Sequence, residues 1–360
     1  MNKLIIEKKD LISNIKTIKK FAGKSKVIAV VKYNGYGLGL IEYTEVLIEE
    51  GIDYFAVAST EEALKLREKY KNIEILNMSS TANKDEINLM INNNITITIG
   101  SKESFEAVKE CTKRKKARAH LKIDTGLGRY GFLPEEIEIM KEVINTKNID
   151  LEGVFSHFSI SFYDEVCTKK QFDTFNIIVK ELEKNDFKFK IKHICNSSSF
   201  LLYKNMHLDA VRIGSAFLGR INIPNKYNLK RIGHLESEVS DIKTLPKGHN
   251  VGYSNTYKTD KETKVAIIPC GSIDGINITE GRNKTRVIDK MYYLYNDIKR
   301  DLKGYKHYAK IGNKTYEVIG GIDLSHMVVD ISGSNVQIGD KAIFDINTFY
   351  ANPLLKREYR

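Results

Sequence analysis

The sequence has no long apolar run and few cysteines. No uninterrupted apolar stretch approaches the roughly 20 residues of a membrane-spanning helix, and the N-terminal segment MNKLIIEKKDLISN is too polar for a secretory signal. The cysteines, Cys111, Cys167, Cys195 and Cys270, form no C-x-x-C pair, so neither a zinc site nor a disulfide framework is predicted. We therefore expect a cytoplasmic protein without a metal or a membrane partner.

The net charge of the chain is +11 over 360 residues. Lys and Arg are interleaved with Glu and Asp along the helical segments, and the one dense basic run, KECTKRKKAR, is interpreted as a solvated helix end. We expect no nucleic-acid partner. The length allows two domains, and no internal repeat or low-complexity tract is found.

Short apolar runs alternate with longer amphipathic segments from Val27 to Gly219. The candidate strands cover residues 27–32, 54–59, 73–79, 95–100, 117–124, 151–159, 189–196 and 208–219. Helix-like stretches lie between them, with Ser59 or Thr60 and Ser101 as candidate N-caps. Eight βα units in roughly 200 residues predict an α/β fold, a TIM (β/α)8 barrel.

After Gly219 the pattern changes to alternating strands and turns. We predict that residues 1–230 form the barrel. Residues 231–360 are predicted to form a smaller, mainly β domain, interrupted by a helical insertion near 286–304.

The stretch AVVKYNGYGLG, residues 29–39, places Lys32 at the end of a buried strand. Partial desolvation of a lysine favours the neutral amine, which can form a Schiff base with a carbonyl. A lysine that snorkels at a strand end is an equally good interpretation of this segment taken alone.

Other residues that are unusual at a strand end lie at the ends of the later strands. They are Lys122 and Asp124 at the fifth strand, His157 at the sixth, Asn196 and Ser197 at the seventh, and Arg212 and Gly214 at the eighth. Each alone could be a satisfied core residue or a member of a buried ion pair. Active sites of TIM barrels gather at the C-terminal ends of the strands, so their convergence on one rim predicts an active site there.

The chain resembles the alanine racemase family through seven blocks in order: AVVKYNGYGLG, LKIDTGLGRYGF, FSHFS, CNSSSFL, AVRIGSAFLG, VGYSNTY and NPLLKREY. The resemblance covers nearly the whole chain. It implies a pyridoxal-phosphate-dependent amino-acid racemase, an isomerase that interconverts L- and D-alanine. D-alanine is a D-amino acid that serves as a peptidoglycan precursor. It also implies a homodimer with shared active sites and a small amino acid as substrate.

Carried over residue by residue, the resemblance implies that Lys32 holds the cofactor through its amine. The implied phosphate-binding set is Tyr36, Ser197, the backbone at Gly214 and Ser215, and Tyr359. Arg212 matches the arginine that faces the pyridine nitrogen. Because a guanidinium is not deprotonated, it keeps that nitrogen unprotonated, which favours simple reprotonation over transamination.

Racemisation needs a base on each face of Cα. The resemblance implies Lys32 for one face and, for the other, Tyr253 supplied across a dimer interface; a hairpin tyrosine that packs on the barrel is the alternative. It implies a carbamate on Lys122, with Arg129 beside it as donor to the cofactor's phenolic oxygen. Arg129 and the backbone of Leu324 are implied to bind the substrate. His157 and Asn196 are implied to line the cofactor pocket.

Two blocks depart from the family pattern. Ser272 in GSIDG replaces a tyrosine near the substrate entrance, and Leu324 and Ser325 in GIDLSH stand at a Met and an Asp position. These departures leave the substrate open between alanine, serine and a larger amino acid. A decarboxylase of the same architecture is a weaker alternative, because its longer glycine-rich loop and C-terminal cysteine block are not found. A non-catalytic or regulatory pyridoxal-phosphate protein is usually a lone barrel, so the β domain favours an enzyme.

Overall fold

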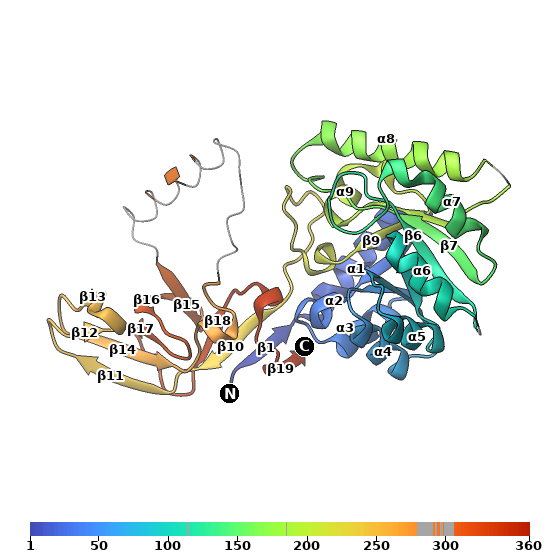
Figure 1. Cartoon of the computed structure of the whole chain (residues 1–360). Helices are drawn as coiled ribbons and strands as arrows, with labels where there is room; N and C mark the ends of the chain where they lie inside the picture. The colour runs from blue at the N-terminus through green and yellow to red at the C-terminus, as the bar shows by residue number, and fades with distance from the viewer. Residues whose placement is uncertain (114, 185, 279–290, 292–293, 296–297, 299–305) are drawn as a thin grey trace. The chain divides into compact units, whose positions relative to one another are not determined.

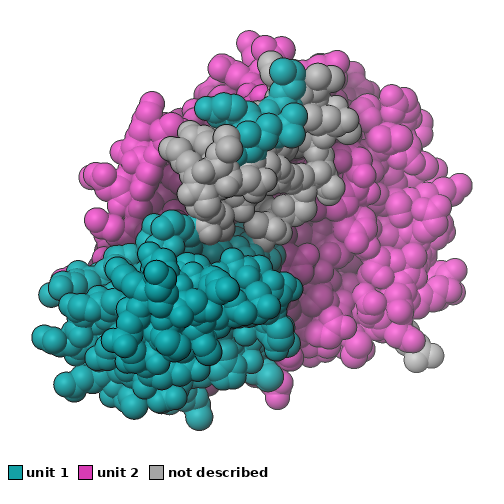
Figure 2. Space-filling view, turned by 90° about the vertical axis from the view of Figure 1, so that its left-hand side faces the viewer, with its two compact units in different colours: residues 1–6, 233–360 teal, residues 7–232 magenta. Residues whose placement is uncertain are grey.

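The computed structural model describes residues 1–360 apart from 114, 185, 279–290, 292–293, 296–297 and 299–305. The described residues form two compact units, coloured separately in Figure 2. Residues 7–232 form the barrel unit, and residues 1–6 together with 233–360 form the β unit.

Within its described residues, the barrel unit has eight parallel strands that close on themselves (Figure 1). They are β2 (Lys26–Val30), β3 (Tyr54–Val57), β4 (Glu74–Ser80), β5 (Thr96–Ile99), β6 (Ala117–Lys122), β7 (Ile149–Phe155), β8 (Ile191–His193) and β9 (Ala210–Ile213). The helices are α1 (Lys8–Ala22), α2 (Lys32–Tyr36), α3 (Leu40–Glu49), α4 (Thr60–Lys69), α5 (Lys84–Asn92), α6 (Lys102–Cys111), α7 (Ile137–Asn145), α8 (Glu165–Leu182) and α9 (Ser197–Leu202). The predicted TIM barrel is confirmed.

Burial and capping explain why these segments form these elements. All four residues of β3 are buried, and Ile28, Val30 and Leu76 pack with Tyr54 in one core cluster, as expected for strands covered on both faces. Ser59 is the N-cap of α4 and accepts the N–H of Glu62, and Ser101 caps α6 in the same way. The strands therefore end at defined places, and the loops that follow them are positioned by a rigid scaffold.

The β unit contains, in the residues that are described, a nine-stranded sheet in the order β11-β14-β17-β16-β15-β18-β10-β1-β19. Its strands are β1 (Lys3–Ile6), β10 (His234–Glu238), β11 (Asp241–Leu245), β14 (Thr263–Ile268), β15 (His307–Ile311), β16 (Lys314–Ile322), β17 (Met327–Asp330), β18 (Lys341–Phe344) and β19 (Lys356–Tyr359). A small hairpin pairs β12 (Asn250–Val251) with β13 (Tyr257–Lys258). The two chain ends meet here, because β1 runs parallel to β19.

The division of the chain differs from the predicted one at its start. The sequence assigned residues 1–230 to the barrel, whereas residues 1–6 belong to the β unit, since β1 pairs with β10 and β19. The helical insertion predicted near 286–304 lies outside the described residues except for positions 291, 294, 295 and 298. In the part of the chain that is described, no helix combines the length and the apolar character needed to cross a membrane.

Candidate active site

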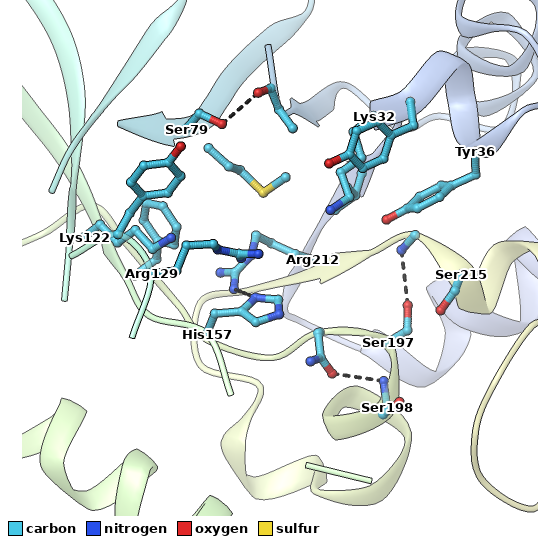
Figure 3. Close-up of a pocket in the computed structure, with 18 of the residues that line it drawn as sticks. Lys32, Tyr36, Ser79, Lys122, Arg129, His157, Ser197, Ser198, Arg212 and Ser215 are labelled. Atoms are coloured by element: carbon cyan, nitrogen blue, oxygen red, sulfur yellow. Dashed lines mark hydrogen bonds between the residues drawn. The ribbon is translucent and has the colours of Figure 1, made fainter. Parts of the chain in front are cut away.

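Lys32 follows β2 at the C-terminal end of the barrel and begins α2. From Tyr33 to Tyr36 the backbone of α2 is left-handed: φ and ψ are 54° and 57° at Tyr33 and 55° and 47° at Asn34, and φ is 55° at Tyr36. Such a conformation costs roughly 1–2 kcal/mol per L-residue, and backbone strain of this kind clusters at functional sites. The turn directs the side chains of Lys32 and Tyr36 into one pocket (Figure 3).

A cavity of about 550 Å³ lies at this end of the barrel, and the described residues that line it all belong to the barrel unit. Predicted site residues that line it are Lys32, Tyr36, Lys122, Arg129, His157, Asn196, Ser197, Arg212, Gly214 and Ser215 (Figure 3). They belong to β6 and β9 or to the segments that follow β2, β6, β7, β8 and β9. The closed barrel therefore brings residues that lie far apart in the sequence into one site.

Positive charge dominates this cavity. Lys32, Lys122, Arg129 and Arg212 line it, and among the lining residues that the structure describes none is Asp or Glu. Burial, with the charge of Arg129, lowers the pKa of Lys32. Burial, with the charges of Arg129 and Arg212, lowers the pKa of Lys122 to about 7. Unpaired positive charge in a partly buried site is unfavourable, so the cavity suits an anionic ligand.

The loop that carries Arg129 is organised by the buried carboxylate of Asp124. Oδ1 of Asp124 accepts the backbone N–H groups of Gly126 and Leu127, each at 2.8 Å. Oδ2 accepts those of Gly128 at 2.8 Å and Arg129 at 3.2 Å. Asp124 is thus committed to the backbone of this loop and holds Arg129 at the cavity.

We expect Asp124→Asn to destabilise the protein by roughly 1–3 kcal/mol, because an amide NH₂ would face N–H donors that now share a carboxylate. The midpoint of thermal unfolding, monitored by circular dichroism, measures the effect. Asp150→Asn is the matched control, since Asp150 makes only a surface ion pair of 3.5 Å with Lys190 and is expected to change stability by less than about 1 kcal/mol. Equal midpoints for the two variants would contradict the role of Asp124.

The guanidinium of Arg212 is buried and fixed by acceptors from neighbouring strands. Its Nη2 donates to the carbonyl oxygens of Ser156 at 2.6 Å and Ile194 at 3.1 Å, and to Nδ1 of His157 at 3.2 Å. Its Nη1 donates to Nδ1 of His193 at 2.6 Å. Burial lowers the pKa of Arg212 to about 10, which leaves it charged at neutral pH. Burial and the charge of Arg212 lower the pKa of His157, which remains a neutral acceptor.

Hydroxyl and backbone groups line another part of the cavity. Oγ of Ser197 accepts the backbone N–H groups of Gly214 and Ala216, both at 3.2 Å. A Cβ on Gly214 would lie 2.4 Å from the hydroxyl oxygen of Tyr36, so only glycine lets Tyr36 approach this closely. Burial raises the pKa of Tyr36, which keeps its hydroxyl neutral. These are neutral hydrogen-bonding groups of the kind that bind phosphate oxygens.

Three predicted site residues, Tyr253, Leu324 and Tyr359, belong to the β unit. The side chains of Tyr253 and Leu324 are 77% and 65% exposed, and Tyr359 ends β19. The described lining of the barrel cavity includes none of the three. Their part in a site therefore stays a prediction.

The two segments that depart from the family pattern are adjacent within the β unit. The N–H of Ser272 donates to the carbonyl oxygen of Asp323, and that of Ile273 donates to the carbonyl oxygen of Leu324, both at 3.0 Å. Ser325 is hydrogen-bonded through Oγ to the imidazole of His326 at 2.9 Å. The departures thus change one continuous patch of the β unit.

Sequence reasoning missed several residues of the cavity. They include Tyr33, Met78, Ser79, Tyr130, Phe155, Phe162, Ser198 and Asn222. Tyr33 and Tyr130 directly follow predicted residues, and Ser79 ends a predicted strand, so their positions along the chain could have indicated them. Asn222 lies in a loop beyond the last barrel strand, where no sequence pattern pointed to it.

Comparison with known proteins adds to this geometry. Residues 6–221 match the family model of the alanine racemase N-terminal domain, and residues 232–348 match that of the C-terminal domain. Alanine racemase 1 of Caldanaerobacter subterraneus subsp. tengcongensis is 33% identical over 92% of this chain and 81% of its own. Alanine racemase of Methanococcus maripaludis is 31% identical over 91% and 84%. The structure of alanine racemase from Clostridium difficile 630 superposes with a TM-score of 0.87 at 26% identity, covering 100% of this chain and 95% of that one.

Proposed function

The chain belongs to the alanine racemase family, whose members are pyridoxal-phosphate-dependent isomerases, and from this premise we propose that it interconverts L- and D-alanine with Lys32 and Tyr253 as its two bases. The single observation that carries the proposal is the rim cavity, where a lysine of lowered pKa lies among cationic and hydroxyl groups. The proposed active form is a homodimer in which one copy supplies Tyr253 to the barrel of the other.

The residues of the cavity fit pyridoxal phosphate. Four basic side chains without an acidic residue in the described lining suit the negative charge of a phosphate and of a substrate carboxylate. Tyr36, Ser197 and the backbone of Gly214 and Ser215 would hold the phosphate, together with Tyr359 of the β unit. When bound, the cofactor draws electrons from the substrate Cα and makes its proton acidic.

Lys32 is proposed to anchor the cofactor and to move a proton on one face of Cα. Both tasks need a neutral amine, and burial lowers the pKa of Lys32 in that direction. Tyr253 is proposed as the acid-base group on the other face, because a racemase must deliver a proton opposite to the one it removes. Since the two residues belong to different units, a second copy of the chain could complete the site.

Arg212 is proposed to face the pyridine nitrogen of the cofactor, and His157 and Asn196 to line the same part of the cavity. The carbonyl oxygens of Ser156 and Ile194 hold the guanidinium in place. Because Arg212 has only N–H donors, it would hydrogen-bond to an unprotonated ring nitrogen and would not protonate it. This arrangement favours return of the proton to Cα.

Arg129 and the backbone of Leu324 are proposed to bind the substrate carboxylate, and Arg129 also to contact the cofactor's phenolic oxygen. A carbamate on Lys122 would give Arg129 an anionic partner and fix its guanidinium. The amine must be neutral to react with carbon dioxide, and the pKa of Lys122 near 7 provides that form at physiological pH.

The Lys122 carbamate is tested by ¹³C NMR of protein equilibrated with ¹³C-bicarbonate. We expect a carbamate signal that weakens as the pH falls below about 7, where the amine becomes protonated, and that is absent in Lys122→Arg. Lys141→Arg is the control, because an exposed ion pair with Glu138 raises the pKa of Lys141 and keeps it an ammonium. A signal that persists in Lys122→Arg would rule out this residue as the site.

The proposed activity is tested with a panel of L-amino acids in heavy water, followed by chiral analysis of the products. A racemase exchanges the Cα proton and inverts the centre, a decarboxylase releases carbon dioxide, and a non-catalytic cofactor-binding protein does neither. The patch around Ser272 and Leu324 favours including serine and larger side chains, because it departs from the family pattern. Faster turnover of serine than of alanine would show that serine is the preferred substrate and would still support racemisation as the reaction.

A further inference from the structure

A line of buried hydrogen bonds runs through the barrel interior, away from the cavity. Nη1 of Arg212 lies 2.6 Å from Nδ1 of His193, Nε2 of His193 lies 2.9 Å from Nδ1 of His120, and Nε2 of His120 lies 3.1 Å from the hydroxyl of Tyr54. Tyr54 begins β3, His120 belongs to β6 and His193 ends β8. The exposed fractions of the Tyr54, His120 and His193 side chains are 5%, 1% and 0%.

The chemistry of arginine sets the direction of this line. A guanidinium only donates, so Nδ1 of His193 must accept and its proton must sit on Nε2. That proton is donated to Nδ1 of His120, which places the proton of His120 on Nε2, where it is donated to the oxygen of Tyr54. The reverse direction would leave His193 without a proton on either nitrogen. Each ring therefore has one tautomer.

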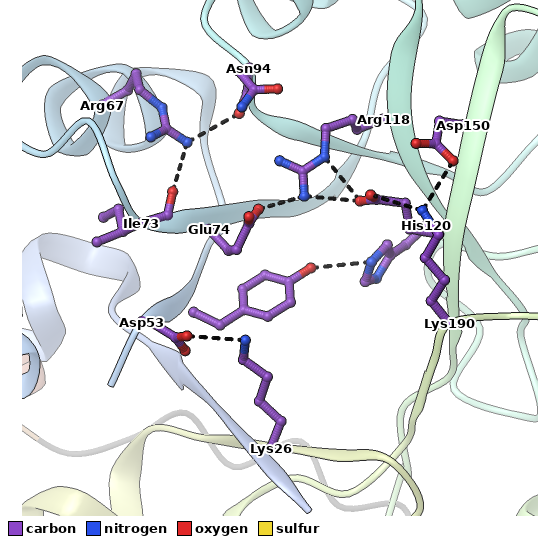
Figure 4. A network of polar contacts seen from close by, with 12 residues as sticks. Lys26, Asp53, Arg67, Ile73, Glu74, Asn94, Arg118, His120, Asp150 and Lys190 are labelled. Atoms are coloured by element: carbon purple, nitrogen blue, oxygen red, sulfur yellow. Dashed lines mark hydrogen bonds and ion pairs between the residues drawn. The ribbon is translucent and has the colours of Figure 1, made fainter. Parts of the chain in front are cut away.

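The surroundings keep both rings neutral. Burial, with the charges of Arg118 and Arg212, lowers the pKa of His120 to about 3, and burial lowers the pKa of His193 as well. Arg118 is itself paired with Glu74 at 2.5 Å and Glu152 at 3.0 Å, near the N-terminal ends of β4 and β6 (Figure 4). Each neutral imidazole accepts one hydrogen bond and donates the next, so the donor-to-acceptor direction is the same along the whole line and neither ring is charged.

Packing leaves the rings little freedom to turn. The ring of His193 stacks on Phe155 with a centroid distance of 4.9 Å and an angle of 4° between planes. The guanidinium carbon of Arg212 lies 5.1 Å from the centroid of the same Phe155 ring. A Cβ on Gly153 would lie 2.6 Å from ring atoms of His120, so glycine makes room for that imidazole. Because the rings cannot turn, the Nε2–H of His120 has an acceptor only if the Tyr54 hydroxyl is present at the end of the line.

We propose that Tyr54 is a positioning residue for Arg212, acting through His120 and His193. By accepting the last hydrogen bond, the Tyr54 hydroxyl completes the line in the direction that Arg212 sets. It thereby helps to hold both rings in place, and with them Nδ1 of His193, which accepts from Nη1 of Arg212 alongside the carbonyl oxygen of His193. The inference rests on the proposed function only where it connects Arg212 to catalysis. The hydrogen-bond line itself is a property of the chain without cofactor.

The test is Tyr54→Phe, which keeps the ring and removes the hydroxyl. In cofactor-free protein with ¹⁵N-labelled histidine, the assigned signals of His120 and His193 in the parent should be those of neutral imidazoles with the proton on Nε2. In the variant the Nε2–H of His120 loses its acceptor, so the ring ¹⁵N signals of both His120 and His193 should move. Turnover of the loaded enzyme should fall about 3- to 10-fold with KM within about twofold, as for the loss of one net hydrogen bond.

Tyr70→Phe is the matched control, because it removes a tyrosine hydroxyl that donates to the carbonyl oxygen of Ile41 at 3.2 Å elsewhere in the barrel unit. It should leave the ring signals and the turnover at parental values. Unchanged ring signals or unchanged turnover in Tyr54→Phe, or an equal loss of turnover in Tyr70→Phe, would overturn the role of Tyr54. A parental protein with the expected ring signals and no racemase activity would overturn the proposed function and leave the hydrogen-bond line supported.

Discussion

Replacing Tyr253 with phenylalanine is expected to slow racemisation by roughly 10²- to 10⁴-fold, the loss expected when a general acid-base group is removed. The change deletes one hydroxyl from a side chain that is 77% exposed in the chain, so folding should be unaffected. Cofactor binding and its yellow colour should also persist, because Lys32 and the cavity lie in the barrel unit. Initial rates from both enantiomers, followed by chiral chromatography, measure the effect.

The loss should be unequal for the two enantiomers. With one base removed, Lys32 should still exchange the Cα proton of one of them, which we expect to be D-alanine, while conversion between enantiomers nearly stops. Proton exchange in heavy water, measured separately for L- and D-alanine, distinguishes this pattern from a general loss of activity. Tyr308→Phe, another exposed tyrosine of the β unit, is the control and should behave like the parent.

The same mechanism predicts that activity depends on association of two copies. Specific activity should fall on dilution with a midpoint that matches the dimer–monomer transition seen by analytical ultracentrifugation. Parental activity in Tyr253→Phe, or full activity in a protein that sediments as a monomer, would remove Tyr253 from the mechanism and favour the cofactor-binding alternative.

Replacing Lys32 with alanine is expected to lower racemase activity by roughly 10⁴-fold or more, because one residue would lose both its anchoring and its proton-transfer role. The purified parent should be yellow, and borohydride reduction followed by peptide mapping should place the cofactor on Lys32. The variant should lack this covalent label. Its thermal midpoint should not fall below that of the cofactor-free parent, since truncation removes a half-buried amine whose charged form is disfavoured by burial.

Lys16→Ala provides the comparison, because Lys16 makes only an exposed 3.8 Å ion pair with Glu50 on the outside of the barrel unit. It should keep the colour, the label at residue 32 and the parental rate. A borohydride label found on Lys122 or on any other lysine would show that the cofactor anchor has been assigned to the wrong residue.

The barrel could be predicted from sequence because its strands are buried on both faces. Continuous apolar runs such as the one from Ile28 to Val31 mark such strands without knowledge of their partners. Strand β1 could not be placed in the same way. Its segment Lys3–Ile6 is short, and its parallel partner Lys356–Tyr359 is at the other end of the chain, so only tertiary pairing shows that it belongs to the β unit.

Prediction of the site depended on residues whose chemistry stands out at a strand end. Lys122 and Arg212 are unusual in buried positions, Lys32 is half-buried just after a strand, and the barrel geometry then placed the three together. His120 and His193 gave no such signal, because a histidine inside a strand is most simply a satisfied core residue. Only the distances between them show that they connect Arg212 to Tyr54.

The left-handed turn from Tyr33 to Tyr36 has a consequence for chemical synthesis. Positive φ and ψ near 50° are strained for L-residues and relaxed for their mirror images. A semisynthetic protein with D-tyrosine at position 33 or D-asparagine at position 34 would therefore retain this backbone with less strain, whereas a D-residue at Ile28 in the right-twisted β2 would disrupt the barrel. The turn that directly follows Lys32 thus has a backbone suited to D-residues.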